Sequence, residues 1–189
     1  MPPKAKVTKE MVAHAAFEVA RETGWENINA RTTANRLDCS TQPVMYHFAT
    51  IEELKKAAYD VADRYHTEYL MDTGQGDILL DIGLNYIRFA AEEKNLFRFL
   101  FQSGYAIGNN LTEIINSEEL APILLPMQKA MGLDMEQTKE VFATLAMLVH
   151  GYASLIANNG MKYNEEHIAE HLKRVYKGAV SVLHGEGTK

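Results

Sequence analysis

Residues 28–50, INARTTANRLDCSTQPVMYHFAT, constrain the fold of this 189-residue chain more than any other segment. Asn29 is placed to cap a short helix over 30–37, and Ser40 to cap another over 41–47, because short polar side chains accept hydrogen bonds from the first N–H groups of a helix. Pro43 falls in the first turn of the second helix, where its missing N–H does little harm. Two short helices joined so closely predict a helix-turn-helix.

The rest of the chain also has apolar residues at helical spacing, divided by caps and breaks. Thr8 is placed to cap a first helix that ends at Gly24, and Thr50 with Glu53 forms a capping box for a long helix to about Leu70. After a break at 72–76, further helices are expected over 77–93, 95–103, 118–131, 134–158 and 164–183. We predict an all-α protein. A three-helix domain over residues 1–50 is joined by the long helix to a larger helical domain over 51–189.

Charge and composition indicate in which cell compartment the protein is expected and whether its N-terminal segment is compatible with DNA binding. No apolar run reaches the roughly 18–20 residues of a membrane span, and the basic N-terminus has no apolar stretch behind it. Cys39 is the lone cysteine, so a reducing cytoplasm is expected. The net charge is −6, but residues 1–50 hold six Lys or Arg against five acidic residues, and residues 51–189 hold 13 against 20. A weakly basic N-terminal segment is compatible with DNA binding.

The outward side chains of the helix-turn-helix are suited to DNA. An apolar spine is expected to hold the two helices together through Ile28, Ala34, Leu37, Val44 and Phe48. The second helix then offers hydrogen bonds to phosphates and base edges, and apolar surface to thymine methyl groups. At the start of the first helix of the pair, Asn29 and Arg31 are suited to phosphate. Many helical bundles contain such pairs without touching DNA, which leaves a helical protein–protein adaptor as the alternative function.

A longer pattern over residues 8–56 resembles the N-terminal domain of the tetracycline-repressor (TetR) family of transcriptional regulators. The spacing is kept without gaps through Ala15-Ala16, Gly24-Trp25, Asn29-Ala30-Arg31, Ala34, Leu37, Ser40, Tyr46-His47-Phe48 and Glu52-Glu53-Leu54. The departures are Met45 where the family usually has Tyr, Asp38 for the usual Gly of the turn, and Ile51 for a phosphate-binding Lys that Lys55 and Lys56 partly replace.

The resemblance implies that residues 1–50 form a DNA-binding domain and that residues 51–189 form a regulatory domain that binds a small molecule and dimerises. The family's contacts carry over to residues of both short helices. With the neighbouring side chains, the predicted DNA-binding set is Asn29, Arg31, Ser40, Thr41, Gln42, Pro43, Val44, Tyr46, His47 and Lys55. The function implied is a repressor that a small-molecule effector releases from a double-stranded operator.

Two long apolar stripes near the C-terminus are candidates for the homodimer interface, in the form of a four-helix bundle. They run through Val141 and Leu145 and then Leu148, Tyr152, Leu155, Ile168, Leu172, Val175, Ala179 and Val182. The alternative is that they only close the core of one subunit. Gly151 in the middle of its helix indicates either a close helix crossing or room for a ligand, since Gly there costs about 1 kcal/mol relative to Ala.

A second group of aromatic and methionine side chains is a candidate ligand pocket, because such side chains adapt to varied apolar molecules. Its residues are Phe97, Phe101, Tyr105, Met127, Phe142, Met147 and His150. The alternative is again ordinary core packing, and His150 on an apolar face fits either.

An enzyme is not expected. The sequence shows no nucleophile elbow, phosphate loop or metal-ligand spacing of a known kind. His167 and His171 lie one helical turn apart, which is compatible with a metal, but the charged residues around them indicate a solvated helix face. No cofactor, metal or membrane partner is predicted.

Overall fold

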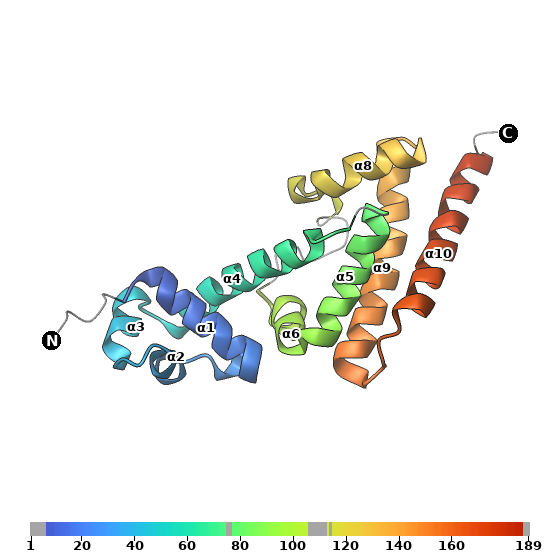
Figure 1. The fold of residues 1–189 in the computed structure, drawn as a ribbon. Coiled ribbons are helices and arrows are strands. Elements are labelled where there is room, and N and C mark those ends of the chain that lie inside the picture. The colour runs from blue at the N-terminus through green and yellow to red at the C-terminus, as the bar shows by residue number, and fades with distance from the viewer. Residues whose placement is uncertain (1–6, 75–76, 106–112, 114, 187–189) are drawn as a thin grey trace. The chain divides into compact units, whose positions relative to one another are not determined.

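The computed structural model describes residues 7–74, 77–105, 113 and 115–186 (Figure 1). Every regular element in these ranges is a helix, which confirms the predicted all-α class. By packing, the chain divides into two compact units. The first comprises residues 1–68 with 93–106, and the second comprises residues 69–92 with 107–189.

The first unit is built on α1 (Lys9–Thr23), α2 (Ala30–Arg36), α3 (Thr41–His47), most of α4 (Ile51–Met71) and α6 (Lys94–Gln102). A short 3-10 helix, η1 (Trp25–Asn27), joins α1 to α2. Helix α1 begins where predicted, because the Thr8 hydroxyl accepts from the Met11 N–H at 3.2 Å. The small and branched side chains of these helices form a closely packed core that includes Val12, Ala16, Phe17, Ile28, Ala34, Val44, Phe48 and Leu54.

Helix α6 belongs to the first unit because its aromatic side chains pack there. The Phe99 ring stacks on Trp25 at 6.1 Å between centroids and meets the edge of Tyr59 at 5.6 Å. The Tyr59 hydroxyl also donates to the Leu100 carbonyl at 3.3 Å. The packing unit therefore extends past residue 50, and the predicted division at residue 50 remains a prediction about function.

The second unit contains α5 (Ile78–Glu92), the 3-10 helix η2 (Glu118–Leu120), α8 (Ala121–Met131), α9 (Met135–Asn159) and α10 (Glu165–Glu186). Helices α5 and α10 both pack on α9, and Figure 1 shows α10 returning beside α9 in the opposite direction. The Asp134 and Gln137 capping box starts α9 as predicted. Two apolar clusters fill this unit, one around Leu84, Ile87, Ile156, Ile168 and Leu172 and the other around Met127, Met131, Leu133 and Val141.

One helix among the described residues, α9, is long and apolar enough to span a membrane by length and composition alone. The sequence has no uninterrupted apolar run of that length, because Thr144, His150 and Ser154 interrupt it. In the single chain, 22% of the most apolar window of α9 is buried. Much of its apolar surface is therefore left uncovered by this chain.

Candidate nucleic-acid interface

Helix α2 is started by a reciprocal capping box. The Asn29 side-chain oxygen accepts from the N–H groups of Arg31 and Thr32, both at 3.0 Å. In return, the Thr32 hydroxyl accepts from the Asn29 N–H at 3.1 Å. Asn29 is exposed, as its predicted DNA contact requires, but its amide oxygen already serves the helix.

The turn between α2 and α3 is closed by backbone hydrogen bonds. The Cys39 N–H donates to the Ala34 carbonyl at 3.1 Å, and the Asp38 N–H donates to Asn35 at 3.3 Å. Asp38 adopts a φ of 47°, a left-handed conformation in which Asp and Asn are tolerated better than most residues. Ser40 stands at the N-cap of α3 as predicted, but its side chain makes no capping hydrogen bond.

Helix α3 has one buried face. Val44 is 0% exposed and Phe48 is also buried, so both belong to the spine that holds α3 in the unit. The predicted DNA contact of Val44 is therefore wrong. The physical reason is that a helix of seven residues needs an apolar anchor on its inner face, and Val44 is the residue that occupies it.

The other face of α3 is open to solvent. Its exposed side chains form two rows, Thr41 with Met45 and Gln42 with Tyr46. Within each row the two residues lie one helical turn apart. Tyr46 is 82% exposed. This is the largest exposed fraction among the exposed large hydrophobic residues in the described part of the chain. Sequence reasoning left Met45 out of the site, although its position one turn after Thr41 was the signal that could have found it.

Two predicted contacts lie at the edge of this open face. The Tyr46 ring meets the edge of His47 at 5.1 Å between centroids, which helps to orient the phenol. His47 is half-buried, and its Nε2 is 2.9 Å from the Val7 carbonyl, so the imidazole joins the end of α3 to the start of the described chain. Pro43 is also half-buried, whereas Ser40 is exposed.

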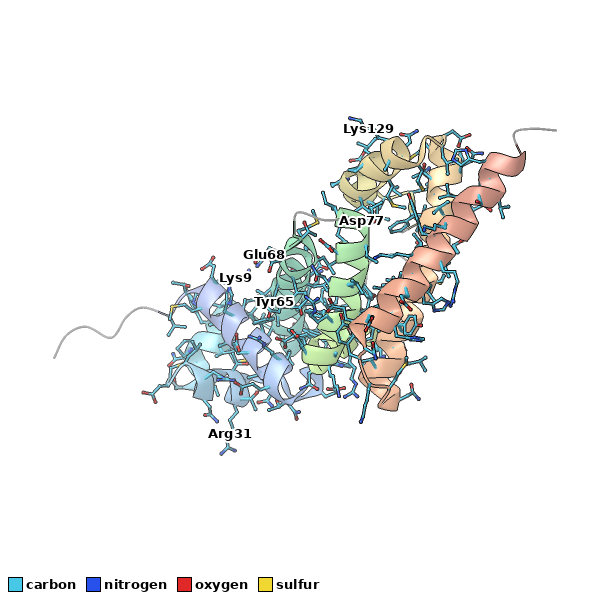
Figure 2. The ribbon with its side chains drawn as sticks, turned by 45° about the vertical axis from the view of Figure 1, so that its right-hand side comes forward. Lys9, Arg31, Tyr65, Glu68, Asp77 and Lys129 are labelled. Carbon is cyan, nitrogen blue, oxygen red and sulfur yellow. The ribbon has the colours of Figure 1, made fainter. Side chains whose placement is uncertain are left out.

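Cationic side chains project from other helices of the first unit. Arg31 is exposed and extends from α2 into solvent (Figure 2). Lys55 lies with its Nζ 5.1 Å from the Trp25 ring centroid, and Lys9, which was not predicted, lies 5.2 Å from Phe48. Two further cations are engaged in ion pairs, Arg36 with Glu22 and Lys56 with Asp60 at 3.4 Å.

Of the seven predicted ligand-pocket residues, three belong to the first unit and four to the second. In the first unit, Phe97 and Phe101 contact each other with centroids 5.0 Å apart. Tyr105 packs on Trp25 and Tyr59, and burial together with a hydrogen bond to Glu52 raises the pKa of its phenol to about 12.

The remaining pocket candidates belong to the second unit. Met127 is buried and Phe142 packs against its cluster. His150 accepts or donates a hydrogen bond with the Tyr86 hydroxyl at 2.9 Å, and burial lowers the pKa of its imidazole. Met147 is 53% exposed. The surface hollow between α9 and α10 and the one beside Asn116 are lined by none of the seven candidates, so the pocket stays a prediction.

The predicted dimer residues divide between core and surface. Ile168 and Leu172 are buried within one subunit against α5 and α9, so the prediction that they contact a partner is wrong. Leu148 and Tyr152 pack on the same cluster, and the Tyr152 hydroxyl is 2.7 Å from His171 Nδ1. Leu155 and Val182 remain, with 48% and 60% of their surfaces exposed. Val175 and Ala179 line the surface hollow between α9 and α10.

A more exposed apolar stripe lies on α9 beside the predicted one. It runs through Met147, Gly151 and Leu155, which are four residues apart and all exposed. A Cβ atom added at Gly151 would meet nothing within 4 Å, so no close helix crossing within this chain explains the glycine. Of these three residues the sequence pattern assigned only Leu155 to the interface, because α9 is apolar on more than one face and spacing alone does not say which face the subunit covers.

The geometry defines a helical protein with an N-terminal helix-turn-helix, and comparison with known proteins places this fold. Neither a protein-family model nor a curated protein matches the sequence. A member of the TetR family from Streptomyces coelicolor A3 matches with a TM-score of 0.55 at 17% identity, over 88% of this chain and 96% of that chain. The multidrug binding protein EbrR, complexed with imidazole, matches with a TM-score of 0.52 at 18% identity, over 88% and 93%. The chain therefore has a TetR-like fold, as its sequence predicted.

Proposed function

We propose that this protein is a sequence-specific DNA-binding transcriptional regulator of the cytoplasm. The observation that carries the proposal is the open face of α3, where Thr41, Gln42, Met45 and Tyr46 project above the buried Val44. A short helix anchored on one side and hydrogen-bonding on the other is the arrangement that enters a major groove. The TetR-like fold supports the same function.

The regulator acts as a homodimer through α9 and α10. The exposed stripe of Met147, Gly151 and Leu155, together with Val182 on α10, gives one subunit an apolar surface that a second copy would cover. A twofold dimer presents two recognition helices about 34 Å apart, which fits an operator with two half-sites. Neither Gly151 nor Gly178 has a neighbour within 4 Å of an added Cβ, which leaves room for close helix approach.

A small-molecule effector releases the dimer from its operator. The support is the TetR-like fold and the description of one structural neighbour as a multidrug binding protein. Helix α4 runs from the first unit, where its Tyr65 ring contacts Phe17 of α1, into the second at Tyr69, and so offers a continuous connection between them. A coupling of only about 1–3 kcal/mol would weaken operator binding 5- to 150-fold.

The test is a fluorescence titration of the full-length protein against labelled DNA from upstream of its own coding region, at two salt concentrations. Tight binding that depends on sequence and weakens steeply with salt is expected. The variants Gln42→Ala and Tyr46→Ala should weaken binding to the specific duplex while the dimer persists. Glu68→Gln, an exposed residue at the far end of α4 (Figure 2), is the matched control and should bind as the wild type does.

Two results would contradict the proposal. Equal affinity for the upstream and random duplexes at both salts would favour the protein–protein adaptor. Unchanged affinity of both α3 variants, with sequence-dependent binding intact, would move the reading surface to another helix.

A further inference from the structure

The open face of α3 carries no ionised side chain. Its two rows present the hydroxyl and methyl of Thr41, the amide of Gln42, the thioether of Met45 and the phenol of Tyr46. From residue 39 to residue 51 the sequence contains no Lys, Arg, Asp or Glu. The face is thus half hydrogen-bonding and half apolar.

This composition limits which base edges the face can read. In the major groove, the O6 and N7 acceptors of guanine are read chiefly by Arg or Lys, and the N4 donor of cytosine is read by Glu or Asp. Gln pairs in two places with adenine N6 and N7, and apolar side chains contact the C5 methyl of thymine. The side chains on the open face of α3 are of the kinds that read adenine and thymine. The kinds that read guanine and cytosine are absent from it.

The cationic side chains of the other helices are placed for another role, and Arg36, the nearest to α3 in sequence, is paired with Glu22. Lys9 and Lys55 stand beside the rings of Phe48 and Trp25, and Arg31 projects from α2. Cationic side chains that come from α1, α2 and α4, rather than from the reading helix, suit contacts with phosphates, which position a protein but carry no sequence information directly. They do not supply α3 with a guanine reader.

His47 does not change this reading. It is half-buried, and its Nε2 is engaged with the Val7 carbonyl at 2.9 Å. The ring also supports Tyr46 at 5.1 Å. His47 therefore positions its neighbour and the start of the chain, while the exposed Met45, at 41%, is free to meet a base.

We propose that α3 selects A·T base pairs, with Gln42 on an adenine and Met45 against the C5 methyl of a thymine. The inference rests on the proposed function and specifies the class of DNA that the same face takes, a half-site whose α3-contacted steps are rich in A·T pairs. Met45 is a specificity-determining residue because a flexible, polarisable thioether can follow the methyl-lined wall of such a site.

The first experiment selects bound duplexes from a random-sequence pool with the full-length protein and sequences them. Enrichment of A·T pairs at the centre of each half-site is expected. Enrichment of G·C pairs there would overturn this inference and leave the DNA-binding function standing. No enrichment of any sequence would overturn the proposed function itself.

The second experiment replaces each thymine of the selected half-site by deoxyuridine, which keeps base pairing and removes only the C5 methyl. Wild-type affinity should fall about fourfold at the thymine that Met45 contacts. The Met45→Ala variant should bind the thymine duplex less tightly and lose most of its sensitivity to that replacement. Met11→Ala is the matched control, since Met11 on α1 has the same 41% exposure, and it should keep the wild-type sensitivity.

Each remaining outcome is decisive for Met45. Equal wild-type affinity for the thymine and deoxyuridine duplexes would overturn the methyl contact. A Met45→Ala variant that keeps the full thymine preference would assign the methyl contact to another residue and overturn the role given to Met45.

Discussion

Arg21 of α1 donates from its Nε to both carboxylate oxygens of Glu93, each at 3.0 Å, although the two residues are 72 positions apart. Glu93 is the residue between α5 and α6, and only 12% of its side chain is exposed. The Tyr65 hydroxyl completes the group, because it accepts from Arg21 and donates to Glu93, both at 3.2 Å. Figure 2 shows Tyr65 on the helix beside α1.

The first prediction concerns this charged group. Glu93→Gln should lower the free energy of unfolding by about 1–3 kcal/mol, because Arg21 loses a charged, largely buried acceptor. Glu22→Gln is the control, since Glu22 pairs with Arg36 while 57% of its side chain is exposed, and it should cost no more than about 1 kcal/mol. Urea denaturation of the two variants measures both values. Equal losses would show that burial of Glu93 adds nothing to the pair.

The second prediction concerns the turn of the helix-turn-helix. Asp38 has a φ of 47°, a conformation that costs most L-residues roughly 1–2 kcal/mol and glycine little. Asp38→Gly should therefore be more stable than Asp38→Val by about that amount in thermal or urea unfolding. At Asp60, which is exposed within α4, the order should reverse because glycine is the poorer residue in a helix. The same order at both positions would contradict the assignment of strain to Asp38.

The third prediction concerns pH. His66 is buried on α4 with its ring edge against Phe101, and burial lowers the pKa of its imidazole from 6.5 to about 4. Between these values the unfolded chain binds a proton that the folded chain does not. The free energy of unfolding therefore has its full contribution from the neutral His66 above about pH 6.5. It loses that contribution as the pH falls from 6.5 toward 4.

Between pH 7 and pH 5, the wild type should lose about 2 kcal/mol more of its free energy of unfolding than His66→Gln loses. Urea midpoints at the two pH values provide the measurement. If His66→Gln keeps the wild-type pH dependence, the titration belongs to other groups.

The fourth prediction concerns the dimer. Leu155→Glu and Val182→Glu should each convert the dimer to monomers at micromolar concentration, because a charge would be placed in an apolar interface. Lys129→Glu, at an exposed site on α8 (Figure 2), should remain dimeric. Analytical ultracentrifugation distinguishes the two states. A dimer that survives both apolar substitutions would place the interface outside the exposed faces of α9 and α10.

Local signals in the sequence determined where the helices begin. The Thr50 hydroxyl accepts from the Glu53 N–H at 3.1 Å, and the Asn164 side chain accepts from the His167 N–H at 3.0 Å, each at a predicted cap. Such contacts join residues three positions apart, so neighbours in the chain suffice to specify them. The two short helices on either side of Asp38 are also specified by neighbouring residues. The helix-turn-helix, and with it the TetR-like fold, could therefore be predicted from the sequence.

Only the tertiary structure decided which apolar face is core. Val44, Ile168 and Leu172 were expected at interfaces and are buried within the subunit, whereas Met147 and Met45 are exposed. Apolar spacing identifies a stripe on a helix but not the helix that covers it, because the partner lies far away in the sequence. The Arg21–Glu93 pair has the same origin, since its geometry exists only after α1 and α6 have packed together.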